Sequence, residues 1–205
     1  MIAQDLKYPL TNDNIVNTLL LGTLMVILTI FIIPIFTLMG YYIKVINHGS
    51  RDLPAPEFKN YFELTLIGVK YAALMVVYVL TLGASVIAIS AIGAMIHESL
   101  YILSLIIAFS LYMLYLYLIP AILYQFAKDY RISDAFNFNK MFAMARSLTY
   151  AKIAIYFTIV YPIIFVTLQF GLIMSMIGIV LVPASIVYEL ISYGKVISNI
   201  KQIDA

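Results

Sequence analysis

The residues best placed for chemistry are the few polar side chains inside long apolar segments. Glu189 lies in such a segment near the C-terminus, six residues before Lys195. A carboxylate there is a candidate functional group, because a membrane interior penalises an unpaired charge. It either pairs with a cation from a loop, lines a polar cavity, or sits near the membrane surface bonded to a tyrosine. Together with Gln169 and Tyr188 it forms the candidate intramembrane polar site.

The other polar residues suggest neither a metal site nor a reaction centre. His97 and Glu98 are adjacent in a short turn, and His48 falls in a loop expected on the opposite side of the membrane. Zinc needs three or four ligands close together, so these residues do not suffice. The sequence also lacks a phosphate-binding glycine loop and a zinc-protease motif. We therefore predict no cofactor, no metal and a non-enzymatic protein.

Composition places these residues in a membrane protein. The chain has 205 residues, of which 64% are hydrophobic and 11% charged, and its mean hydropathy is +1.02. A soluble domain carries about 25% charged residues. We predict an all-α, polytopic membrane helix bundle that forms a single domain over residues 1–205. The net charge of +2 gives no indication of a nucleic-acid partner.

Five apolar segments are long enough to cross a bilayer, which takes about 20 residues. They are Ile15–Val45, Leu64–Ile96, Leu100–Phe126, Leu148–Phe170 and Leu172–Ile191. Pro34 interrupts the first. We favour a single span kinked at Pro34; the alternative is a helical hairpin broken there, which gives six spans.

The positive charges indicate the orientation. Eleven of the twelve Lys and Arg residues, all except Lys7, lie in the loops after the first and third segments, near the segment ends that adjoin these loops, or in the C-terminal region. The positive-inside rule therefore places both basic loops and the C-terminus in the cytoplasm at the cell membrane. Five spans put the N-terminus outside, whereas the hairpin alternative puts it inside.

Each basic loop also contains an amphipathic segment, which we call an elbow. Such segments lie at the membrane surface with aromatic side chains among the acyl chains and cations at the headgroups; alternatively, they simply lead into the next span. The predicted lipid-facing residues are Phe58, Tyr61 and Phe62 in the first elbow and Phe138, Met141 and Phe142 in the second. The predicted headgroup cations are Lys44, Lys59, Lys70, Lys140, Arg146 and Lys152.

The two elbows and the spans that follow them suggest an internal duplication. In each copy an elbow leads into a span, a short turn and a second span with a Pro and a Tyr near its cytoplasmic end. The predicted copies cover residues 58–128 and 138–195.

Several short motifs resemble a known family. They are Gly40-Tyr41-Tyr42-Ile43-Lys44-Val45, Leu53-Pro54, Phe62, Gly68-Val69-Lys70, Tyr8-Pro9, Gly22, Pro120-Ala121 and Ala135-Phe136-Asn137-Phe138. With these motifs the chain resembles the family catalogued as domain of unknown function 4013. The resemblance implies a small, mostly archaeal, multi-pass membrane protein, and it transfers no catalytic residues.

The sequence therefore favours a membrane scaffold or lipid-contacting structural protein that forms homo-oligomers. Its expected partners are membrane lipids, with other membrane proteins as further candidates. The first alternative is a subunit of a small-solute transporter or channel, supported by the Pro residues and Glu189. The second is a lipid-modifying membrane enzyme, for which Glu189 and Lys195 are the candidate groups.

Overall fold

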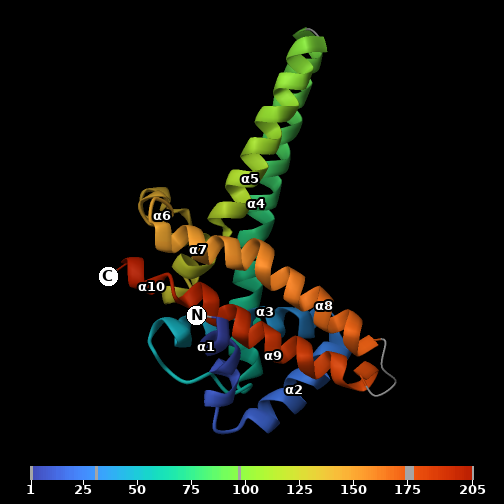
Figure 1. Cartoon of the computed structure of the whole chain (residues 1–205), viewed down its shortest axis with the longest axis vertical. Helices are drawn as coiled ribbons and strands as arrows, with labels where there is room; N and C mark the ends of the chain where they lie inside the picture. Colours follow the sequence, from blue (N-terminus) through green and yellow to red (C-terminus); the bar gives the residue numbers. More distant parts are fainter. Residues whose placement is uncertain (1, 31, 97, 174–177, 205) are drawn as a thin grey trace.

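The computed structural model describes residues 2–30, 32–96, 98–173 and 178–204, and within these ranges every regular element is helical. Figure 1 shows one long helical hairpin projecting from a cluster of shorter helices. The elements are α1 (Ile2–Lys7), η1 (Tyr8–Thr11), α2 (Ile15–Ile27), η2 (Leu28–Ile30), α3 (Ile32–Ser50), α4 (Tyr61–Ile96), α5 (Glu98–Asp129), η3 (Asp134–Phe136), α6 (Phe138–Ala145), α7 (Leu148–Ile155), η4 (Tyr156–Val160), α8 (Tyr161–Ile173), α9 (Gly178–Ser198) and α10 (Lys201–Asp204).

The projecting hairpin consists of α4 and α5, each about 50 Å long at 1.5 Å per residue. Its outer half exposes large apolar side chains on both helices, including Leu80, Ile87 and Met95 of α4 and Ile106 and Phe109 of α5. The inner half packs against α3 and the second basic loop. The hairpin is thus a single object with one packed end and one unpartnered apolar end (Figure 1).

The first expected span is not one kinked helix, because the chain reverses within it. Asn12 donates one hydrogen bond to Thr18 of α2 (3.1 Å) and another to the Pro56 carbonyl (2.9 Å). Tyr41 of α3 donates to that same carbonyl (2.9 Å). A continuous helix would hold residues 18 and 41 about 35 Å apart. The chain therefore folds back on itself within this segment, and two membrane passes by α2 and α3 stay a prediction.

Pro34 is not at the tip of this first hairpin. The α-helix ends at Ile27, η2 follows, and α3 begins at Ile32. Pro34 therefore sits in the first turn of α3, where a missing backbone N–H costs nothing, because the first N–H groups of a helix have no intrahelical acceptor.

Helices α3 and α4 cross in backbone contact, and this crossing anchors the long hairpin to the rest of the molecule. A Cβ added to Gly40 would lie 1.7 Å from the Leu64 carbonyl oxygen, and one added to Gly68 would lie 1.7 Å from that of Phe36. The hydroxyls of Thr37 and Thr65 share a hydrogen bond of 2.8 Å at the same crossing. Small residues allow this close approach, as in other membrane helix pairs.

Tyr150 of α7 supports α5 where Pro120 interrupts it. The Tyr150 hydroxyl donates to the Tyr117 carbonyl (2.7 Å) and accepts from the Ala121 N–H (3.3 Å). A regular helix would join these two backbone groups directly. The hydroxyl thus gives both groups a side-chain hydrogen-bond partner directly beside Pro120, where a proline weakens a helix.

Three helical stretches are long and apolar enough to cross a membrane by length and composition: Tyr61–Met95, Leu100–Asp129 and Leu148–Ile173. A fourth results if Asp5–Thr11 and Ile15–Ile27, which meet at 104°, count as one broken span. The second, third and fourth expected spans thus match long helices, and the expected fifth falls on α9, which begins at Gly178. The internal duplication stays a prediction. Its two predicted copies differ at their starts, because a separate short helix, α6, begins residues 138–195 but none begins residues 58–128.

Candidate functional site

The main candidate site is a partly open cavity of about 550 Å³ at the junction between the long hairpin and the C-terminal helices. Seven elements supply its lining: Leu6 of α1, Tyr42 of α3, Tyr71 and Met75 of α4, Ile119 and Leu123 of α5, Phe157 of η4, Tyr161, Pro162, Ile164 and Phe165 of α8, and Ile186, Glu189, Leu190, Ser192 and Tyr193 of α9. Most of these side chains are apolar. The volume lies within the roughly 300–1,000 Å³ range of small-ligand sites.

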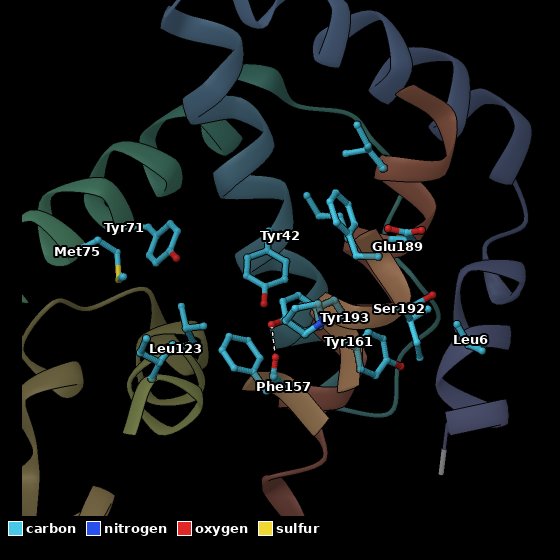
Figure 2. Close-up of a pocket in the computed structure, with 16 residues that line it drawn as sticks. Leu6, Tyr42, Tyr71, Met75, Leu123, Phe157, Tyr161, Glu189, Ser192 and Tyr193 are labelled. Atoms are coloured by element: carbon cyan, nitrogen blue, oxygen red, sulfur yellow. Dashed lines mark hydrogen bonds between the residues drawn. The ribbon is translucent and has the colours of Figure 1, made fainter. Parts of the chain in front are cut away.

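Stacked aromatic rings form the centre of the cavity (Figure 2). The Phe157 and Tyr193 rings stack with centroids 4.6 Å apart, and Tyr161 and Tyr42 lie 5.2 and 6.2 Å from Tyr193. The Tyr193 hydroxyl donates to the Phe157 carbonyl at 2.5 Å. Phe157 belongs to η4, a π-helical turn between α7 and α8. Such turns are rare and frequent at functional sites.

The predicted polar site lies at one end of this cavity. Gln169 of α8 donates to Ser185 of α9 (3.0 Å) and, at 3.5 Å, to Oε2 of Glu189. Glu189 lines the cavity and, in the part of the chain described, forms neither an ion pair nor a hydrogen bond to a tyrosine. Its Oε1 is buried without a hydrogen-bond partner. Glu189 therefore lines a cavity, but this cavity is mostly apolar, whereas the expected one was polar.

Tyr188, the third predicted member, points elsewhere. Its hydroxyl donates to the Leu6 carbonyl at 2.5 Å and so holds α1 against α9. Asn199 adds a hydrogen bond of 3.2 Å to Asp5, and the Lys195 ammonium lies 5.0 Å above the Tyr8 ring. The N-terminal segment therefore covers α9, and its Leu6 closes one side of the cavity.

Sequence reasoning missed the tyrosines of the cavity. The hydroxyls of Tyr42 and Tyr161 are buried and have no hydrogen-bond partner within the described part of the chain. Tyr42 belongs to the Gly-Tyr-Tyr motif, which offered a signal. Tyr161 lies beside Pro162 in an apolar segment and offered none, because tyrosines are frequent in this chain and most of them pack.

The predicted elbows differ from each other. In the second, α6 forms as a helix, with Asn137 accepting a hydrogen bond from the Lys140 N–H, and Phe138 and Phe142 are exposed while Met141 is buried. In the first, no separate helix forms: Phe58 lies in the loop before α4 and is buried against Tyr41. Phe58 and Met141 are therefore core residues, which corrects their assignment as lipid-facing.

Tyr61 and Phe62, the remaining residues of the first elbow, begin α4 and are exposed, Phe62 at 79%. They still present aromatic rings at the start of the long hairpin, beside the Lys59 and Glu57 side chains, which form an ion pair of 2.7 Å. That part of the elbow prediction stays open.

The predicted headgroup cations are in part paired within the protein. Lys44 lies 3.5 Å from Glu63, and Lys59 pairs with Glu57. The side chains of Lys70, Lys140, Arg146 and Lys152 are exposed. A further ion pair joins Lys201 to Asp52, where the lysine lowers the pKa of the carboxyl.

The described residues do not bring together three or more metal-ligating side chains. The His48 ring contacts the Pro54 carbonyl at 3.2 Å, and burial lowers its pKa. The side chains of His97 and Glu98 lie outside the described residues. The cavity itself, with an apolar lining and a few polar groups, has the features of a small-molecule binding site.

The fold and this cavity define an all-helical protein with membrane-compatible hairpins. A family model described as Protein of unknown function (DUF4013) matches residues 23–182, so the chain belongs to that family. No curated protein and no solved structure matches the chain.

Proposed function

We propose that the protein is a non-enzymatic, multi-pass membrane protein that contacts and holds membrane lipids. The observation that carries this proposal is the apolar cavity of about 550 Å³ beside a helical hairpin whose outer half exposes apolar side chains. Exposed apolar surface of this extent is unfavourable in water and favourable in a bilayer. In that setting, an acyl or isoprenoid chain is the most abundant molecule that fits the cavity.

The proposal includes an orientation with both termini and both basic loops in the cytoplasm. Asn199 bonds to Asp5, and Tyr8 donates to the Leu53 carbonyl of the first basic loop at 2.9 Å. Groups in such contact lie on the same side of a bilayer, so an even number of crossings is required. The hairpin formed by α2 and α3 supplies the extra crossing, which favours an N-terminus inside.

Self-association is the scaffold part of the proposal. Ala84, Ala88 and Ala91 are exposed on the outer half of α4, and nothing lies within 4 Å of a Cβ added to Gly83. Small side chains allow a second helix to approach closely in a membrane. Because the chain has no Cys, an Ala88→Cys variant tests this cleanly: oxidative cross-linking in membranes should give a dimer, and its absence would remove the scaffold role.

Tryptophan fluorescence tests lipid contact, since the chain has no native Trp. We would place single Trp residues at Leu80 on the outer hairpin, at Phe157 in the cavity and at Arg51 in the first basic loop. In nanodiscs with chain-brominated lipids, the first two should be quenched and the third should not. An unquenched Leu80→Trp would overturn membrane insertion of the hairpin. Quenching of Leu80→Trp without Phe157→Trp would leave the cavity without lipid.

A further inference from the structure

The cavity is largely apolar, and the Glu189 carboxylate and the Ser192 hydroxyl lie on one side of it. Figure 2 shows Glu189, Ser192 and Leu6 on one side, Met75 and Leu123 on the opposite side, and the tyrosine rings between them. A ligand that uses the whole cavity must therefore be amphiphilic. Its head belongs beside Glu189 and its chain beside Met75 and Leu123.

The unpaired atoms define the chemistry of that head. Among the described residues, five buried side-chain oxygens lack a hydrogen-bond partner, and three of them belong to residues that line the cavity: Glu189 Oε1 and the hydroxyls of Tyr42 and Tyr161. The carboxylate oxygen needs a donor, while each hydroxyl can donate or accept. Native proteins rarely leave buried polar atoms unpaired, so three around one cavity indicate that a ligand completes them.

The charged residues that line the cavity restrict which ligand head groups can bind there. Glu189 is the one acidic residue among the described residues that line the cavity, and none of these is Lys, Arg or His. A head with its own negative charge would meet Glu189 with no cation to offset the repulsion. A protonated amine would gain a charge-assisted hydrogen bond, and a hydroxyl would gain a neutral one.

We propose that the cavity selects single-chain amphiphiles whose head donates hydrogen bonds and carries no negative charge, as in a long-chain amine or alcohol. This inference rests on the proposed lipid binding and adds the identity of the head. Glu189 accepts from the head, and the chain extends past the tyrosine rings towards Met75 and Leu123.

Three photoreactive probes test this selectivity. Each has the same hexadecyl chain with a diazirine, and the heads are an amine, an alcohol or a carboxylate. The 205-residue protein is labelled in phosphatidylcholine nanodiscs, and the labelled peptides are identified by mass spectrometry. Labelling of the peptides that contain Met75 and Leu123, in the cavity, is compared with labelling of the exposed region around Phe109. The amine and alcohol should label the cavity in preference to Phe109, and the carboxylate should label both regions alike.

Variants assign the selectivity to Glu189. Glu189→Gln should reduce cavity labelling by the amine roughly tenfold, the scale of a lost hydrogen bond to a charged group, while labelling by the alcohol persists and shows that the cavity is intact. Glu57→Gln, the same carboxylate-to-amide change in the first basic loop and away from the cavity, should change neither. Equal cavity labelling by all three heads, or an unchanged amine signal in Glu189→Gln, would overturn the inference. Cavity labelling by no probe would also overturn it, and Phe157→Trp quenching then decides separately whether lipid binding survives.

Discussion

The two halves of helix α4 are both predominantly apolar, but their surroundings differ. In the inner half, Gly68 touches the backbone of α3, Leu74 is fully buried, and Tyr78 donates to the Ala135 carbonyl at 2.6 Å. In the outer half, Leu80 and Ile87 are 66% and 70% exposed. The difference comes from a few residues that make specific contacts, since apolar side chains are common to both halves.

This comparison shows what each half requires. The inner half is held by backbone contact and by hydrogen bonds from tyrosines, so it is specific to this fold. The outer half makes its described contacts with α5, and the remaining apolar surface needs a non-aqueous environment to be stable. Substitutions matched between the halves should therefore have different effects.

The largest difference is expected for Gly68→Leu and Gly83→Leu, two changes on the same helix. At Gly68 a Cβ would lie 1.7 Å from the Phe36 carbonyl oxygen, whereas at Gly83 nothing lies within 4 Å. Gly68→Leu must separate α3 from α4 and should cost about 3 kcal/mol or more, the upper end for overpacking. The measurement is the thermal stability and monodisperse yield of the purified variants. Equal behaviour of the two variants would show that the crossing does not anchor the hairpin.

A charge in the outer half should have the next largest effect. Ile87→Arg places a cation on the exposed face of α4, which costs about 2.5–3.5 kcal/mol of insertion free energy if that face meets the centre of a bilayer. Phe62→Arg, at the start of the same helix, should cost little because Lys59 and Glu57 already lie there. The fraction that resists alkaline extraction from membranes measures the effect. If Ile87→Arg extracts no more readily than Phe62→Arg, the outer half does not lie in lipid.

These contrasts also show how far the sequence could go. Long apolar stretches predicted the membrane class and the extent of α4, α5 and the α7–α8 stretch, because bilayer thickness sets segment length. They could not place the chain reversal near Leu28, since both a kink and a hairpin follow from the same apolar stretch and the deciding contacts, from Asn12 and Tyr41 to Pro56, are distant in sequence.

Some residues of the candidate site could be predicted from the sequence and others could not. Glu189 was found because a carboxylate in an apolar segment is conspicuous. The aromatic wall around it was not, because its rings come from α3, η4, α8 and α9, and long-range packing decides which tyrosines meet. Phe58 was misassigned because the prediction extended a helical face over it, whereas α4 begins at Tyr61 and Phe58 packs against Tyr41 from the preceding loop.

A smaller loss of stability is expected when the Tyr150 hydroxyl, which bonds to the backbone of α5 near Pro120, is removed. Tyr150→Phe leaves the Tyr117 carbonyl and the Ala121 N–H without their shared partner, and a buried unpaired backbone group costs about 1–3 kcal/mol. Tyr112, on the exposed outer part of α5, provides the matched control, and Tyr112→Phe should be neutral. Thermal unfolding in detergent compares the two. If Tyr150→Phe is neutral, the Tyr150 hydrogen bonds do not stabilise α5 near Pro120. The evidence that the packed and exposed halves of the hairpin differ would then come from the Gly68 and Gly83 variants alone.

The smallest loss of stability is expected from breaking the ion pair between Lys201 and Asp52, on the surface of the packed end. Lys201 lowers the pKa of Asp52 below its ordinary value of 3.8, so the pair stabilises the folded chain fully above that value and loses this contribution as the pH falls through the lowered pKa. Asp52→Asn should therefore melt slightly below the wild type at neutral pH, and the two should converge well below pH 3.8. Lys201→Met should reproduce the neutral-pH loss, and a difference that persists in acid would assign the effect to something other than the ion pair. Because Asp52 is exposed and solvent screens the interaction, the shift should be far smaller than that of Gly68→Leu. The packed end is therefore held by buried contacts, and surface charge contributes little to its stability.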